Sequence, residues 1–135
     1  MKLSEKTLNL LKNFASINQS ILFKQGSSLR TMSVMKNILA EADISEEVPQ
    51  DFAIYDLVQF LNGISLYADP ELDFQHQSYL TIRDGKTHRT KYFFADPSVI
   101  VAPPEKSLTL PSEDVSFSMT TNDLTQLLKA AAVYQ

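Results

Sequence analysis

The chain has 135 residues, enough for one domain or for one domain and part of a second. Apolar residues make up 44% and charged residues 21%, close to ordinary folded domains, which excludes intrinsic disorder and fibrous repeats. The absence of cysteine excludes a disulfide scaffold, a thiolate nucleophile and cysteine-based metal sites, and favours an intracellular location. A net charge of −4 argues against binding by bulk attraction to nucleic acid and leaves room only for a local basic surface.

Two further classes of protein are excluded by the sequence pattern. Only three glycines are present, at positions 26, 63 and 85, which cannot build a phosphate-binding loop, so nucleotide hydrolysis is not expected. No apolar run approaches the roughly 18 residues of a membrane span, and charge returns too soon after Met1 for a signal peptide. We therefore expect no membrane partner, no metal and no cofactor.

The first expected element is a helix that begins at Ser4, a suitable capping residue, and runs to about Asn18. Its leucine, phenylalanine and isoleucine residues fall within one broad arc at the helical period, which predicts a buried face. The opposite arc is polar and net positive, and comprises Lys2, Glu5, Lys6, Asn9, Lys12, Asn13 and Ser16.

Extended segments follow. Residues 21–25 and 29–34 flank a turn at 26–28 and predict a β-hairpin, and a third strand is expected over 38–44. Residues 45–50 are expected to form an acidic loop, with solvated carboxylates rather than a cation site at Asp43, Glu46, Glu47 and Asp51.

A second helix is expected to begin near Asp56 and to contain no lysine or arginine. Strands are expected over 72–76 and 79–83, and Asp84-Gly85 predicts a hairpin into a strand over 87–94. A further strand is expected over 98–102. The residues expected to point inward from the second helix are Leu57, Val58, Phe60, Leu61 and Ile64.

Prolines at 103, 104 and 111 predict an extended connector over 103–111, and hence a first domain over 1–102. Beyond it, alternation predicts a strand over 115–119, and Thr120 with Asp123 predicts a capped helix with Lys129 off its apolar face. Residues 112–135 are too few to bury a core of their own. The order of helices and strands predicts an α+β fold.

Three stretches carry a resemblance to a known family: LKNFASIN at 11–18, AIYDL at 53–57 with FL at 60–61, and ADPSVIVAP at 95–103. Together they resemble the DNA polymerase sliding clamp, or processivity factor, of large tailed bacteriophages, in order from Met1 to about Leu128. The resemblance implies the DNA-clamp fold, in which antiparallel sheets form the outer wall of a ring. Helices packed on one face of the sheets line a hole around duplex DNA.

The resemblance also implies a noncatalytic role in the cytoplasm of the infected host cell. The partners it implies are duplex DNA, encircled without sequence preference, a DNA polymerase, an ATP-driven clamp loader and further copies in a homo-oligomer. It also implies a role in late transcription. A sliding protein needs diffuse charge, because each bidentate base contact is worth roughly 1–3 kcal/mol and would act as a brake. The resemblance makes Lys2, Lys6, Lys12 and Lys129 the candidate DNA-facing residues. The alternative is that these lysines, opposite an apolar helix face, are only solvated.

Clamps usually bind a short peptide of the polymerase or loader in an apolar pocket near the domain connector. In this sequence the resemblance places that site at Val101, Leu108 and Leu110, whose alternative role is to pack the connector onto the sheet. Family members continue through a complete second domain, whereas this sequence ends at Gln135. A truncated product, a shortened clamp that assembles with more copies and half of a split clamp stay open as interpretations.

Two rival functions come from the residues themselves. An enzyme or metal site could use His76, His88, Asp73, Asp84 and Asp96, but their spacing matches no ligand motif, so catalysis is not expected. A small module for single-stranded nucleic acid or protein interaction could instead use the basic hairpin from Arg83 to Lys91. The alternation of strands weakens this second reading, because Arg83 and Lys91 need not share a face with His88. The basic residues are Arg83, Lys86, His88, Arg89 and Lys91, interleaved with Tyr79, Tyr92 and Phe93.

Overall fold

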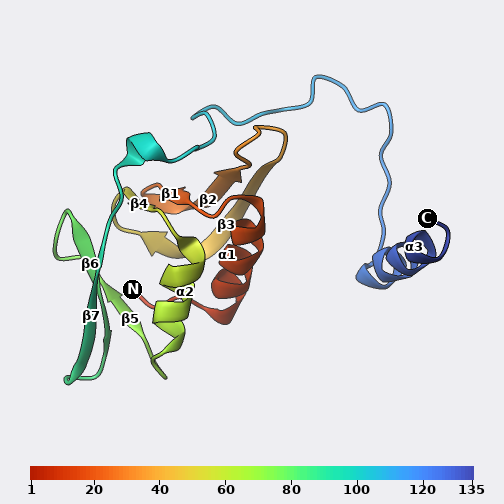
Figure 1. Ribbon diagram of the computed structural model, residues 1–135. Helices are drawn as coiled ribbons and strands as arrows, with labels where there is room; N and C mark the ends of the chain where they lie inside the picture. Colours follow the sequence, from red (N-terminus) through yellow and green to blue (C-terminus); the bar gives the residue numbers. More distant parts are fainter. The chain divides into compact units, whose positions relative to one another are not determined.

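A computed structural model describes residues 1–135 and divides the chain into two compact units, 1–104 and 105–135, which are described separately. The first unit contains two α-helices, seven strands and one 3₁₀ helix, and the second contains one α-helix (Figure 1). The elements are α1 (Glu5–Ile17), β1 (Ile21–Phe23), β2 (Gly26–Met32), β3 (Leu39–Val48), β4 (Phe52–Ile54), α2 (Leu57–Ser65), β5 (Glu71–Asp73), β6 (Tyr79–Asp84), β7 (His88–Phe93), the 3₁₀ helix η1 (Pro97–Val99) and α3 (Thr121–Val133).

Both helices of the first unit begin where they were predicted to begin, and each has a capping side chain at its start. The Ser4 hydroxyl accepts a hydrogen bond from the Thr7 amide at 3.2 Å, which satisfies one of the free donors at the start of α1. The Asp56 carboxylate accepts from the Gln59 amide at 2.9 Å at the start of α2. The prediction that Val58 points inward is wrong: it is 50% exposed, because it lies at the border of the arc formed by the four buried residues of α2.

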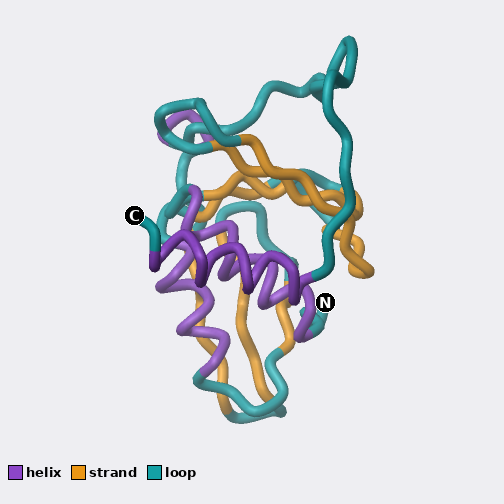
Figure 2. Tube along the Cα trace, turned by 90° about the vertical axis from the view of Figure 1, so that its right-hand side faces the viewer, coloured by secondary structure: helices purple, strands orange, loops and turns teal.

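The strands, orange in Figure 2, form three small antiparallel sheets, with orders β1-β4, β2-β3 and β5-β6-β7 (Figure 1). The predicted hairpin between residues 21–25 and 29–34 is therefore wrong. Strand β1 pairs with β4, and its Phe23 ring stacks on Phe52 with centroids 4.4 Å apart. Gly26 has a φ of +120° and already belongs to β2, so no tight turn forms there.

The expected acidic loop over 45–50 is also wrong in its first half, because β3 continues to Val48. Val48 lies opposite Gly26 and is buried, and this burial outweighs the poor strand propensity of the glutamates before it. Glu41, Asp43 and Glu47 share the outward side of β3, where all three are exposed.

The hairpin at Asp84-Gly85 is confirmed, with Gly85 at a φ of +66° and Asp84 opposite His88. The sheet β5-β6-β7 buries Leu72, Leu80 and Ile82 toward the helices. The edge of β5 is covered by the chain start, since Met1 and Leu72 exchange two backbone hydrogen bonds of 2.7 Å.

The strand predicted over 98–102 is absent. Pro97 suits the first turn of a helix, and the Asp96 carboxylate accepts from the Ser98 amide, so η1 forms instead. The strand predicted over 115–119 is absent as well, because residues 105–135 contain no second strand to pair with it. The capping pair of Thr120 and Asp123 is confirmed as a reciprocal capping box at the start of α3.

The core of the first unit lies between the helices and the sheets. Helix α1 packs against α2 and against β2 and β3, and the Phe60 ring of α2 meets Tyr92 of β7 at 5.1 Å. Helices thus cover one face of antiparallel sheets, which confirms the α+β class and is consistent with the DNA-clamp fold. No helix combines the length and apolar character needed to cross a membrane.

Candidate functional site

The outward side of α1 is the lysine-bearing surface that the sequence predicted. We define the lysine flank as Lys6 and Lys12 with the polar residues between them, all of which are exposed. The two lysines are six residues apart and so lie about 120° apart around the helix axis, at opposite borders of the flank. Neither ammonium group is within ion-pair distance of a carboxylate. The residues between them on the exposed arc are Glu5, Asn9, Asn13 and Ser16.

A carboxylate on β3 fixes the direction of this flank. Glu46 accepts a hydrogen bond from the Ser4 amide at 2.7 Å and another from the Thr7 hydroxyl at 2.6 Å. Partial burial raises the pKa of Glu46, but the hydrogen bonds from Thr7 and Ser4 outweigh it and hold the pKa below its usual value. The negative charge also lies at the positive end of the α1 dipole. Strand β3 therefore anchors the first turn of the helix that carries Lys6 and Lys12.

Helix α2 adds no charge to this side of the unit. Its exposed side chains are Val58, Gln59, Asn62 and Ser65, in agreement with the predicted absence of lysine and arginine. Of the first unit's helices, only α1 offers cations to solvent.

An apolar hairpin tip lies between β2 and β3 and was not predicted. We define the apolar tip as Val34, Met35 and Ile38, which are 62%, 83% and 50% exposed. The Ser33 hydroxyl accepts from the amides of Asn37 and Ile38 at 3.1 and 3.0 Å and thereby holds the tip in one shape. The Lys-Asn pair at 36–37, between apolar residues, is the turn signal that could have located this tip.

The apolar tip adjoins the predicted partner residue Val101. Asn18 donates one hydrogen bond to the Met32 carbonyl at 2.9 Å and one to the Val101 carbonyl at 3.1 Å. The base of the tip and the segment just before the connector are thus joined through the buried side chain of Asn18. Leu108 and Leu110 belong to the second unit, where they lie in irregular chain and are exposed.

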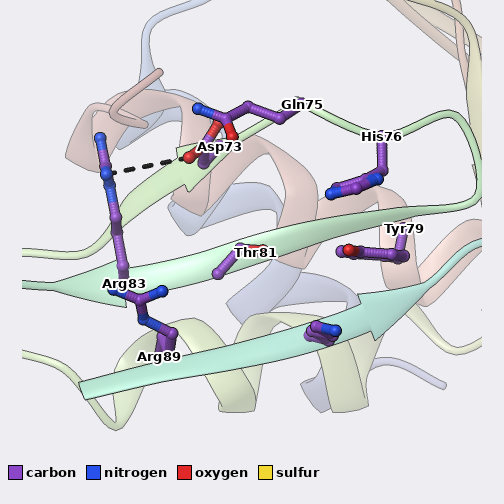
Figure 3. A pocket seen from close by; sticks show the side chains of 8 residues that line it. Asp73, Gln75, His76, Tyr79, Thr81, Arg83 and Arg89 are labelled. Atoms are coloured by element: carbon purple, nitrogen blue, oxygen red, sulfur yellow. Dashed lines mark ion pairs between the residues drawn. The ribbon is translucent and has the colours of Figure 1, made fainter. Parts of the chain in front are cut away.

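The basic hairpin separates its cations by face. Register places Arg83 opposite Arg89 and Thr81 opposite Lys91, so these three cations share the outward face with Tyr79 (Figure 3). His88 lies opposite Asp84 on the other face, and Lys86 lies in the turn, so the five basic residues form no single patch.

The histidines and carboxylates of the predicted enzyme alternative do not converge. Asp73 and His76 line a cavity of about 330 Å³ on the outward face, whereas His88 is on the opposite side of the sheet. The carboxylate of Asp96 caps η1, and this hydrogen bond from Ser98 lowers the pKa of Asp96. No group of three or more histidine, aspartate and glutamate side chains lies close enough together to hold a metal ion.

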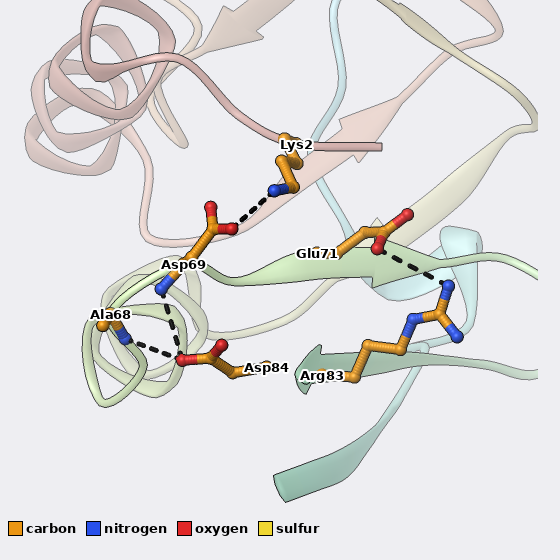
Figure 4. A network of polar contacts seen from close by, with 6 residues as sticks. All are labelled: Lys2, Ala68, Asp69, Glu71, Arg83 and Asp84. Atoms are coloured by element: carbon orange, nitrogen blue, oxygen red, sulfur yellow. Dashed lines mark hydrogen bonds and ion pairs between the residues drawn. The ribbon is translucent and has the colours of Figure 1, made fainter. Parts of the chain in front are cut away.

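Two of the predicted DNA-facing lysines, Lys2 and Lys129, are not part of α1. Lys2 precedes α1, and its ammonium donates to Asp69 at 2.6 Å, a hydrogen bond that raises the pKa of Lys2 (Figure 4). Asp84 accepts from the Ala68 and Asp69 amides at 3.1 and 3.3 Å, which holds Asp69 in place. Lys129 lies on α3 in the second unit and is exposed. Of the three predicted lysines in the first unit, Lys6 and Lys12 share the exposed side of α1, and Lys2 is paired with Asp69.

Comparisons with known proteins agree with the fold. The sequence pattern of a family described as DNA polymerase processivity factor matches residues 2–102. A protein named sliding clamp from Vibrio phage KVP40 is 36% identical over 135 residues, which cover 98% of this chain and 60% of that protein. Sliding clamps from Escherichia phage RB69 and Enterobacteria phage T4 are 41% and 40% identical, over 97% of this chain and 57% of each relative. The chain spans about three fifths of the length of these curated relatives.

Proposed function

This chain belongs to the DNA polymerase processivity factor family, and from this premise we propose that it forms part of a sliding clamp. In this role it tethers a DNA polymerase to duplex DNA and catalyses no reaction itself. Further copies of the chain, or a separate second half, complete a ring around the DNA. A clamp loader places this ring on DNA, and the ring acts in the cytoplasm of the infected host cell. Residues 1–102 form the N-terminal clamp domain, 103–111 the connector and 112–135 the start of a second clamp domain.

The observation that carries this proposal is the lysine flank of α1. Lys6 and Lys12 are exposed and have no carboxylate partner. Helix α1, which carries them, packs against α2, β2 and β3. Unpaired cations spaced along a helix attract DNA phosphates without making base-specific contacts, as sliding requires. Lys129 contributes in the same way from the second unit, whereas Lys2 contributes less because Asp69 already neutralises it.

A partner peptide binds, in this proposal, beside the connector. Val101 provides an apolar contact in the first unit, where the hydrogen bonds of Asn18 join it to the base of the apolar tip. Leu108 and Leu110 provide exposed apolar contacts in the second unit. A rigid tip with three exposed apolar side chains has the character of a protein interaction site, because exposed apolar residues clustered in one place commonly mark one.

The test replaces the charge of the lysine flank. In a Lys6→Gln/Lys12→Gln double variant, two exposed interactions of about 0.2–1 kcal/mol each are lost per subunit. We expect DNA-dependent stimulation of the cognate polymerase to fall about fivefold, with unchanged circular dichroism. Lys86→Gln is the matched control, since Lys86 is equally exposed but lies in the β6–β7 turn. Equal stimulation by the double variant and the wild type would remove the lysine flank from the DNA-facing surface.

Oligomer formation has its own test. Light scattering coupled to size exclusion should show a closed oligomer if this chain completes a ring by itself. A monomer at high concentration would instead require a separate partner for the second half of the ring.

A further inference from the structure

On the outward face of the β5-β6-β7 sheet, cations stand close together on neighbouring strands, where their repulsion lowers the stability of the sheet. Arg83 and Arg89 are directly opposite each other in the β6–β7 register, and Lys91 follows Arg89 on the same side. Like charges opposite each other on neighbouring strands destabilise a sheet. Cations in such an arrangement, in a chain of net charge −4, favour a binding role for the positive charge on this face.

The counter-charge supplied by the chain itself is incomplete. Arg83 lies 3.5 Å from the Glu71 carboxylate and 3.8 Å from Asp73. Arg89 and Lys91 are exposed and have no carboxylate within ion-pair distance. Three cations thus face two carboxylates, and both carboxylates lie beside Arg83, which leaves Arg89 and Lys91 available to an external anion.

The same residues line a defined hollow. Arg83, Arg89 and Lys91 border the cavity of about 330 Å³ together with Tyr79 and His76 (Figure 3). The His76 ring stacks on Tyr79 with centroids 4.3 Å apart, and the Lys91 ammonium lies 4.9 Å from the Tyr79 centroid. A cation over an aromatic ring is held by the ring's electrons, so Lys91 is positioned at the wall of the cavity.

These observations favour one class of ligand. The His76 ring, stacked at 4.3 Å, and the Lys91 ammonium, 4.9 Å from the Tyr79 centroid, both occupy the surface of the Tyr79 ring, which leaves little of it for a nucleic-acid base. Asp73 at the cavity wall and Glu71 beside Arg83 disfavour a long anionic chain along the whole face, while a short acidic segment needs to meet only Arg89 and Lys91. Guanidinium groups bind carboxylates through paired hydrogen bonds.

We propose that this cationic face, defined as Tyr79, Arg83, Arg89 and Lys91, binds an acidic peptide segment of a partner protein. The face lies on a different element from the lysine flank of α1 and from the apolar tip. Its role therefore goes beyond the DNA tether and does not depend on it.

Fluorescence anisotropy of the full chain tests the proposal. The probe is a fluorescein-labelled octapeptide of alternating glutamate and aspartate, compared with its glutamine and asparagine counterpart. We expect the acidic probe to bind about tenfold more tightly, and the preference to disappear in an Arg89→Gln/Lys91→Gln variant, since tenfold corresponds to about 1.4 kcal/mol. A Lys24→Gln/Lys36→Gln variant removes two exposed cations elsewhere and should keep the preference.

Two further arms make the outcome decisive. An Arg89→Glu/Lys91→Glu variant should bind a lysine octapeptide more tightly than a Lys24→Glu/Lys36→Glu variant, which has the same net charge but keeps the cationic face. Equal binding of the acidic and amide probes to the wild type would overturn the proposal. Tighter binding of a labelled oligothymidylate of eight nucleotides, lost in the Arg89→Gln/Lys91→Gln variant, would also overturn it by assigning the face to nucleic acid.

Discussion

Replacement of Glu46 by glutamine tests how the lysine flank is held in place. The carboxylate accepts two hydrogen bonds, from the Ser4 amide at 2.7 Å and the Thr7 hydroxyl at 2.6 Å. Hydrogen bonds to a charged group are worth about 1.5–3 kcal/mol, and solvent access at this site reduces that value. Glutamine keeps the shape and one acceptor, so we expect the free energy of unfolding at pH 7 to fall by about 1–2 kcal/mol.

The dependence on pH separates the charge from the shape. Because the folded-state pKa of Glu46 lies below its usual value, the stabilisation is complete above the unfolded pKa and disappears as pH falls through the folded pKa. The wild type should therefore lose more stability than Glu46→Gln on acidification from pH 7 to pH 3. Urea unfolding followed by circular dichroism at pH 7, 5 and 3 measures this difference.

Glu47→Gln provides the matched control, since Glu47 is exposed on the opposite side of β3 and makes no ion pair. We expect it to change the free energy of unfolding by less than about 0.5 kcal/mol at every pH. The reasoning is refuted if Glu46→Gln costs as much at pH 3 as at pH 7, or if the two variants behave alike.

Five other variants test the fold in three experiments. Leu57→Ala should lower the free energy of unfolding, measured in urea, by about 2–5 kcal/mol because Leu57 is fully buried. Val58→Ala should change it by less than about 0.5 kcal/mol, and equal effects of the two variants would contradict the assigned buried face of α2. Gly63→Ala should stabilise the protein by about 0.5–1 kcal/mol, since the new methyl group meets only Ile82 at 3.9 Å. Gly85→Ala should destabilise the protein by about 1–2 kcal/mol because of the φ of +66° at Gly85. A change of the same sign in both variants would be inconsistent with these backbone conformations. Thr120→Ala should raise amide exchange over the first turn of α3 by about fivefold, as the capping box contributes about 1 kcal/mol, and unchanged exchange would argue against the cap.

The helices were predictable because their signals are local. Ser4 and Asp56 cap α1 and α2 within three residues of the groups they bind, and helical periodicity identifies the buried side. Lys6 and Lys12 were correctly placed in solvent for the same reason. The pairing of β1 with β4 was not predictable, since the whole of β2 and β3 lies between them along the chain. Neighbouring strands along a chain often pair, as β6 and β7 do, and β1 departs from that tendency.

The failures at the site have the same physical origin. Lys2 follows the helical pattern of the first helix, but its partner Asp69 is 67 residues away and lies on a separate loop. The link between the apolar tip and Val101 depends on Asn18, whose two acceptors come from distant segments. Periodicity describes one element at a time, and it therefore cannot show which polar groups from different elements meet.

Retention on DNA of different topology tests the central claim most directly. The protein is assembled with the cognate loader on nicked circular plasmid, and the amount that stays bound is measured before and after the plasmid is cut once. A clamp that encircles duplex DNA without gripping its bases should stay on the circle and leave the linear form through its ends. Equal retention on circular and linear DNA would contradict the tethering account.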